Sequence, residues 1–100
     1  GDATFTAGIV LADISTTGAA TLTFDGTTAQ SVTGAIDGDA AGEGIVTVSN
    51  AAGVTFNTRM GATTLDVVDV STATAVATFK GAVATATSAI VTGTATAAGS

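Results

Sequence analysis

Acidic side chains carry most of the chemistry available to this chain, because it contains no histidine and no cysteine. Ser–His and Cys–His nucleophilic pairs are therefore excluded. Asp37, Asp39 and Glu43 lie close together in a glycine-rich segment, residues 37–44. Ca²⁺ binds several oxygen ligands in flexible geometry, so these three residues form a candidate Ca²⁺ site. The alternative is a flexible solvated loop, because the segment supplies fewer ligands than an EF-hand and Asp and Gly favour turns.

A second acidic pair, Asp66 and Asp69, does not suit catalysis. Residues three apart on a strand point to opposite faces, which is the wrong arrangement for two cooperating carboxylates. We expect one of the two to be exposed and the other to pair with a basic residue such as Arg59 or Lys80. With so few acid, base and nucleophile candidates, the sequence predicts that the protein is not an enzyme and holds no cofactor other than the candidate Ca²⁺.

Charge and composition exclude further classes of function. The formal net charge is −6 and only Arg59 and Lys80 are positive, which argues against binding to nucleic acids or anionic membranes. The uncharged segment at residues 81–100 is interrupted by Thr, Ser and Gly and alternates like a strand, so we expect no membrane insertion. Thr, Ala and Gly make up 57 of the 100 residues. Because Ala buries little area, such a core needs support from repetition or from neighbouring chains.

The elements that position these residues are predicted to be β-strands organised around four phenylalanines. Phe5, Phe24, Phe56 and Phe79 are the only aromatic residues, and each occupies the same short phrase: apolar, Thr, Phe, polar, small. In a strand, the apolar residue and Phe would point to one face and the polar residues to the other. We therefore predict that the four phenylalanines are core anchors. No segment has the apolar spacing of a helix.

The spacing of the phenylalanines favours a short β-solenoid-like stack of strands. The spacings are 19, 32 and 23 residues, and 32 becomes 22 if residues 35–44 are an inserted loop. These values match a solenoid rung of roughly 20–25 residues, in which the four phenylalanines would form one internal ladder. The alternative is an antiparallel β-sandwich, completed by a strand from a neighbouring subunit, in which each hairpin needs its own anchor.

Residues 21–56 carry a resemblance to a known class of protein. The segment runs from Thr21-Leu-Thr-Phe through Gly44-Ile-Val-Thr-Val to Val54-Thr-Phe, and the likeness extends over residues 21–94. It resembles the tandem β-strand repeats of bacterial surface proteins, namely autotransporter passengers, S-layer-like proteins and large secreted adhesins. The resemblance implies an extracellular location on the bacterial cell surface and a non-catalytic, repetitive β architecture.

We predict a single domain over residues 1–100 that assembles with copies of itself. Strand edges that lack charged residues, Pro or bulges can pair with another chain, and both termini are strand-like and apolar. Residues 1–15 are the expected intersubunit strand, with residues 3–12 as its donor segment and Phe5, Ile9 and Leu11 as its assembly residues. Residues 95–100 are expected to be a frayed tail.

The predicted function is structural: a homopolymer that forms an extracellular filament or surface layer through strand-edge stacking or strand donation. The alternative is a binding module, either a Ca²⁺-dependent adhesin or an ice-binding surface. The ice-binding alternative rests on Thr-x-Thr elements such as Thr21/Thr23 and Thr85/Thr87. Thr is also a good strand residue on any wet face, which explains these elements without ice.

Overall fold

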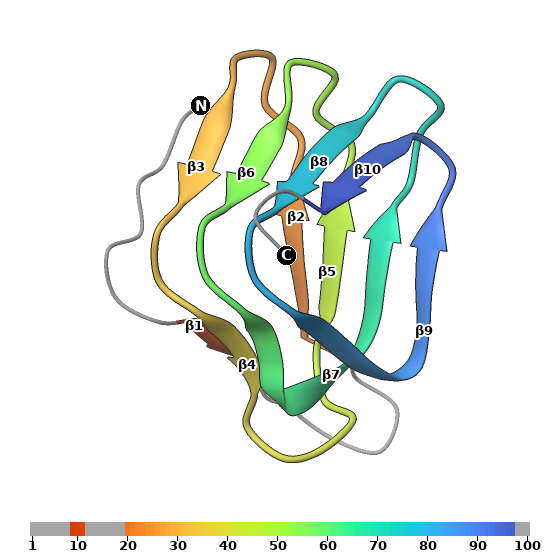
Figure 1. Cartoon of the computed structure of the whole chain (residues 1–100). Coiled ribbons are helices and arrows are strands. Elements are labelled where there is room, and N and C mark those ends of the chain that lie inside the picture. The colour runs from red at the N-terminus through yellow and green to blue at the C-terminus, as the bar shows by residue number, and fades with distance from the viewer. Residues whose placement is uncertain (1–8, 12–19, 98–100) are drawn as a thin grey trace.

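The computed structural model describes residues 9–11 and 20–97. In these ranges the chain forms no helix, and its strands stack in parallel, in about three turns, as a short β-solenoid (Figure 1). Every strand pairing in this part of the chain is parallel. The predicted solenoid is therefore confirmed, and the alternative of an antiparallel sandwich is wrong.

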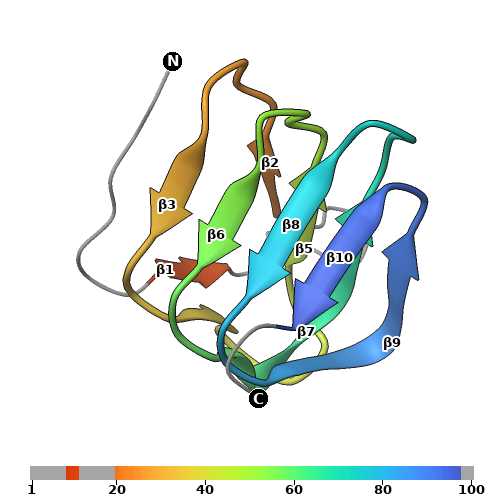
Figure 2. The same ribbon diagram turned by 45° about the horizontal axis from the view of Figure 1, so that its top comes forward.

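Three faces, each a stack of parallel strands, enclose the core. The β2 face holds β2 (Thr21–Phe24), β5 (Ile45–Val48) and the later parts of β7 (Met60–Val70) and β9 (Val83–Val91). The β3 face holds β3 (Gln30–Val32), β6 (Val54–Phe56), β8 (Val76–Phe79) and β10 (Thr94–Ala97). The β4 face holds β1 (Ile9–Leu11), β4 (Ile36–Gly38) and the first residues of β7 and β9. Figure 2 shows the β3 face lying in front of the β2 face.

One rung is a passage of the chain over the β2 face, the β3 face and the β4 face in turn. On the β2 face, Thr21 pairs with Ile45, Ile45 with Val67, and Val67 with Ser88. Successive rungs are therefore offset by 24, 22 and 21 residues along this face. These offsets confirm the rung length expected from the sequence.

The core consists of the inward side chains of all three faces. On β5, for example, Val46 and Val48 are buried while Ile45 and Thr47 are only partly covered, which is the alternation expected of a strand. The buried apolar residues are Phe24, Val32, Ile36, Val46, Val48, Val54, Phe56, Met60, Leu65, Val68, Val70, Ala75 and Ala77.

Three of the four phenylalanines meet in the centre of this core. Phe56 and Phe79 are register partners on the β3 face, and their rings are stacked with centroids 5.2 Å apart. Phe24 projects from the β2 face and meets Phe56 edge-on, with centroids 5.4 Å apart. Phe24 and Phe56 are buried, and Phe79 is partly buried against the same cluster. Both arrangements are favourable for aromatic pairs.

The prediction that all four phenylalanines form one ladder is wrong. Phe24 and Phe56 lie on different faces, and Phe5 lies outside the described residues. The register partner of Phe56 on the preceding rung is Val32, which lies one face beyond Phe24. The long spacing between Phe24 and Phe56 is therefore one rung plus one face. Residues 35–44 are part of a regular rung and not an insertion, since they contain all of β4.

Two segments expected to be irregular also contribute strands. The predicted flexible loop at residues 37–44 begins inside β4, which ends at Gly38. The predicted frayed tail begins inside β10, which pairs with β8 through Ala97. Residues 98–100 lie outside the described part of the chain. Stacking on a preceding rung supplies backbone hydrogen bonds that the local sequence does not reveal.

A buried asparagine, Asn50, holds the turn between β5 and β6. Its side-chain amide donates hydrogen bonds to the carbonyl of Thr28 at 2.8 Å and to Oε1 of Gln30 at 3.0 Å. Its Oδ1 accepts a hydrogen bond of 2.8 Å from the N–H of Ala52. Asn50 is fully buried, and these bonds offset the cost of burying an amide while joining two rungs at this corner.

We expect Phe56→Ala to destabilise the protein by about 3–5 kcal/mol, because it removes a buried ring between two others. Urea denaturation followed by circular dichroism measures the change. Thr55→Ala, which alters the outward neighbour on the same strand, is the control and should stay within about 1 kcal/mol. Similar losses in the two variants would contradict the assignment of Phe56 to the core.

A close approach between rungs predicts that Gly61→Ala is also destabilising. Gly61 has a φ of 78°, and a Cβ at this position would overlap the backbone carbonyl of Ala84 on the next rung. We expect a loss of about 2 kcal/mol or more. Gly26→Ala is the control, because its Cβ would meet only the flexible side chain of Gln30. Equal thermal midpoints for the two variants would show that the rungs do not approach this closely.

Candidate functional site

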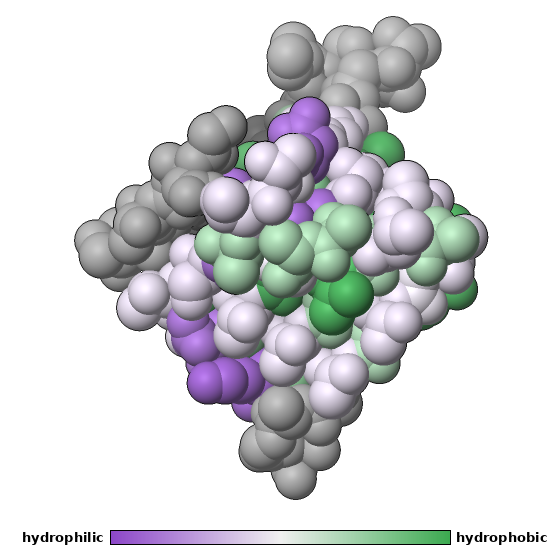
Figure 3. All heavy atoms as spheres, turned by 90° about the horizontal axis from the view of Figure 1, so that it is seen from above, coloured by the Kyte–Doolittle hydropathy of each residue, from purple (hydrophilic) through white to green (hydrophobic). Residues whose placement is uncertain are grey.

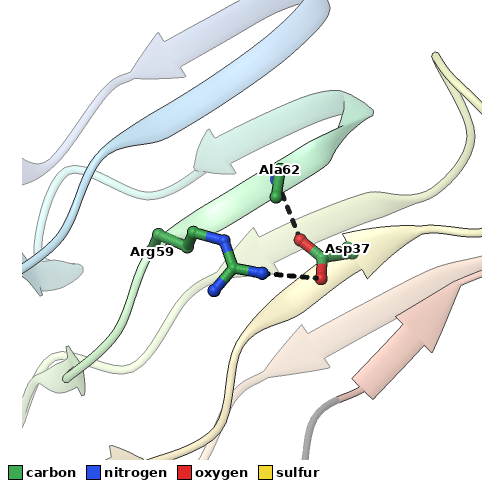
Figure 4. Close-up of polar contacts among 3 residues, drawn as sticks. All are labelled: Asp37, Arg59 and Ala62. Atoms are coloured by element: carbon green, nitrogen blue, oxygen red, sulfur yellow. Dashed lines mark hydrogen bonds and ion pairs between the residues drawn. The ribbon is translucent and has the colours of Figure 1, made fainter.

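Asp37, the first of the candidate Ca²⁺ ligands, lies on β4 and points toward the start of β7 (Figure 4). Its Oδ1 accepts a hydrogen bond of 2.9 Å from the backbone N–H of Ala62, and its Oδ2 lies 3.8 Å from a guanidinium nitrogen of Arg59. The side chain of Arg59 is 53% exposed, so solvent limits this ion pair to less than about 1 kcal/mol. The carboxylate of Asp37 therefore joins two neighbouring rungs.

The other two candidate ligands follow β4 in a turn, where Asp39 is exposed and Glu43 is half-buried. Backbone contacts hold this turn, because the N–H of Gly42 donates to the carbonyl and the hydroxyl of Thr64 at 2.9 and 3.0 Å. Within residues 9–11 and 20–97, no three acidic side chains gather into a group that could hold a metal. The structure does not bring the predicted ligands together, and Ca²⁺ binding stays a prediction.

The two aspartates of β7 also lie apart from any cluster. Asp66 accepts a hydrogen bond from the hydroxyl of Thr87 on β9. Oδ1 of Asp69 is buried and has no hydrogen-bond partner among the described residues. The expected ion pair of one of these aspartates with Arg59 or Lys80 does not form among the described residues, and Arg59 contacts Asp37 instead. Among the described residues, Asp66 and Asp69 therefore do not form a pair of carboxylates that could act on one substrate.

Hydroxyl groups form one file along the outside of the β3 face. Ser31, Thr55, Thr78 and Thr96 occupy equivalent outward positions on β3, β6, β8 and β10. On the β2 face the outward file that begins at Thr23 continues through Thr47 but then meets Asp69 and Ile90. The Thr-x-Thr elements of the sequence therefore do not stack into a two-file array over the described strands.

β9 and β10 form one end of the described stack (Figure 1), and core positions are exposed there. Val91 is the register partner of Val70 and occupies the same inward position one rung later. Val70 is 1% exposed, whereas Val91 is 53% exposed. The difference arises because β7 lies between two strands of its sheet, whereas β9 has a strand on one side only among the described residues. Inward residues of the last rung are therefore left in contact with solvent.

An apolar pocket of about 200 Å³ opens at this end. Its lining includes Val70 and Phe79 together with Ala89, Val91 and Ala95 of the last rung. Ile90, another lining residue, is 46% exposed. Burying such side chains contributes roughly 25 cal/mol per Å² of apolar surface, so contact of this end with another apolar surface would be favourable. We refer to β9 residues 88–91 and β10 together as the open end.

The opposite end of the solenoid is closed. Phe24 on β2 is 4% exposed, Val32 on β3 is 1% exposed, and Ile36 on β4 is fully buried. These residues belong to the first complete rung, on strands that include the sheet edges β2 and β3. The two ends of the same stack therefore differ in the apolar surface that they leave exposed to solvent.

The open end also lacks charge. Lys80 is the last charged residue of the chain, so neither β10 nor residues 88–91 of β9 carry a charge. Edge strands are usually guarded by charge, Pro or a bulge, and the open end has neither charge nor Pro. Figure 3 shows the molecule from above, and not from the open end: most of this surface is pale, with near-neutral hydropathy, a hydrophobic band crosses its middle, and hydrophilic residues lie in separate places at its borders.

The predicted assembly residues lie elsewhere. Residues 9–11 form β1, which pairs with β4 of the same chain, and Phe5 is outside the described residues. The sequence predicts apolar strand edges at both termini, with the N-terminal segment as the assembly strand. The signal for the C-terminal edge was present in the uncharged segment at residues 81–100, where Ile90 and Val91 adjoin. Only the stacking order shows that this segment forms the outermost rung among the described residues.

The contacts of Asp37 predict a modest structural role. We expect Asp37→Asn to lower the free energy of unfolding by about 0.5–1 kcal/mol, because the ion pair with Arg59 is lost while the Ala62 N–H keeps an oxygen acceptor. Asp39→Asn, an exposed control, should leave it unchanged. Both are compared with the unmodified chain in EDTA and in excess Ca²⁺ by thermal unfolding. A Ca²⁺-dependent stabilisation that both variants abolish would contradict this role and establish the metal site.

No apolar helix long enough to cross a membrane occurs among the described residues. Comparisons of the chain with protein-family models, with curated proteins and with solved structures found no match. The resemblance to tandem β-strand repeats of bacterial surface proteins therefore stays a prediction from the sequence.

Proposed function

We propose that this protein is a structural, non-catalytic component of the extracellular bacterial surface whose copies assemble through the open end into a filament or surface layer. One observation carries the proposal: among the described residues, β9 and β10 each have one strand edge without a partner, together with exposed inward side chains such as Val91. A strand added by another chain would form hydrogen bonds with the strand edges and bury the apolar surface.

The chemistry of the open end supports a partner of the same β architecture. An added strand would supply hydrogen-bond partners for the backbone of β9 and β10, and its inward side chains would cover Ala89, Val91 and Ala95. Small inward residues make room for larger side chains from the partner. Thr, Ala and Gly also keep the outer faces smooth, so that neighbouring solenoids can approach closely.

The absence of catalysis and the extracellular location belong to the same proposal. The chain contains no His or Cys, and the carboxylate of Asp37 is engaged by Arg59 and Ala62. The support for location is the resemblance to bacterial surface repeats. A Ca²⁺-dependent adhesin or ice-binding module is the second candidate, and the hydroxyl file Ser31–Thr55–Thr78–Thr96 is the observation that favours it.

Association through the open end predicts a strong effect of one added charge. We expect the average molecular mass of the unmodified protein in sedimentation experiments to rise with its concentration. We also expect ordered assemblies in electron micrographs. Val91→Asp should abolish both, because a carboxylate at this position would be buried without a partner. Ala51→Asp, in an exposed turn, adds the same charge away from the open end and should assemble normally.

Two results would contradict the proposed function. If the chain stays monomeric at high concentration, self-assembly is excluded and the binding module becomes the better candidate. If Val91→Asp and Ala51→Asp impair association equally, the effect comes from net charge and not from the open end.

A further inference from the structure

The two ends of the solenoid differ in exposure, and this difference limits how copies can join. At the open end the inward residue Val91 is 53% exposed, whereas Phe24, at the equivalent position of the first rung, is 4% exposed. A head-to-tail stack would place the open end of one copy on the closed end of the next. That contact would remove apolar surface from water on one side only, because Phe24, Val32 and Ile36 are already buried.

The distribution of charge points in the same direction. Four of the eight acidic residues lie in the first rung or the turns beside it: Asp25, Asp37, Asp39 and Glu43. The open end carries no charge. Two copies that each have a net charge of −6 repel least when their uncharged ends face each other and their acidic ends point apart.

We propose that two copies of this chain dock open end to open end about a twofold axis, with residues 88–91 of β9 beside the same residues of the partner. The inference rests on the proposed function and specifies its contact. A twofold axis across the solenoid reverses the strand direction, so the two edges would run antiparallel, which is a slightly stronger pairing than a parallel one. The apolar pocket of each copy would then be covered by the last rung of the other.

A contact of this kind is self-complementary and closes after two copies. The dimer would present two closed, acidic ends to solvent. Growth into a filament or layer would then use the dimer as its unit and a second contact elsewhere on the surface. Head-to-tail stacking would instead be heterologous and open-ended, so that the same contact would extend the stack without limit.

The two modes can be separated with single cysteines, because the natural chain has none. Thr23 on β2 and Ile90 on β9 occupy equivalent outward positions at the two edges of the β2 face. A twofold contact brings Ile90 beside Ile90 of the partner copy. A head-to-tail contact brings Ile90 beside Thr23 of the next copy. Thr23→Cys and Ile90→Cys therefore form a matched pair of variants of the full chain.

Sedimentation equilibrium of the unmodified chain and crosslinking with a short bis-maleimide test the inference. We expect a dimer as the first associated species, crosslinking of Ile90→Cys alone, and no crosslinking of Thr23→Cys alone. The dissociation constant should rise at least about 100-fold in Val91→Asp. Circular dichroism of each variant checks that it is folded like the unmodified chain.

The remaining outcomes overturn the inference in distinguishable ways. Crosslinking only in a mixture of the Thr23→Cys and Ile90→Cys chains, with masses beyond the dimer, would establish head-to-tail stacking and leave the proposed function intact. A dimer that crosslinks through Thr23→Cys alone would place the contact at the closed end. A monomer at every concentration would overturn both the twofold contact and the proposed function.

Discussion

In-register stacking of successive rungs is the constraint on which the rest of this structure depends. Each inward side chain must fit between its equivalents on the rungs before and after it, while the backbones stay within hydrogen-bonding distance. The position shared by Val48 and Val70 satisfies this condition with two small β-branched residues, and Phe56 satisfies it by stacking on Phe79. A thin core that consists mainly of Val, Ala and Phe is sufficient because repetition adds the same contacts at every rung.

Close stacking also determines what occupies the corners. Gly61 lies so near the backbone of the next rung that a side chain has no room, and Asn50 uses its buried amide to bond the preceding rung. The ion pair of Asp37 with Arg59 likewise crosses from one rung to the next. Asp37, a candidate metal ligand in the sequence, therefore makes contacts between rungs in the structure.

A stack of this kind can in principle be extended by further rungs at either end. The exposure and charge of its two ends therefore determine which contacts with other molecules are favourable. The first rung is closed around Phe24 and Ile36 and lies beside four of the eight acidic residues. The last rung is uncharged and leaves Val91 exposed. Among the described residues, apolar exposure and unpaired strand edges at one end, with burial and charge at the other, are the observations on which the proposed contact between open ends rests.

The sequence alone determined the fold class, because alternation of Thr with apolar residues favours strands and the rung length follows from the recurring phrase around Phe56 and Phe79. It could not place Phe24, since a spacing along the chain does not say on which face a residue falls until the corners are known. Tertiary structure decided that residues 35–44 belong to a regular rung and that Asp37 faces Arg59. It also decided which end of the described stack is open. The exposure of Val91 depends on whether another rung lies beside it, and the order of residues along the chain does not show which residues are neighbours in space.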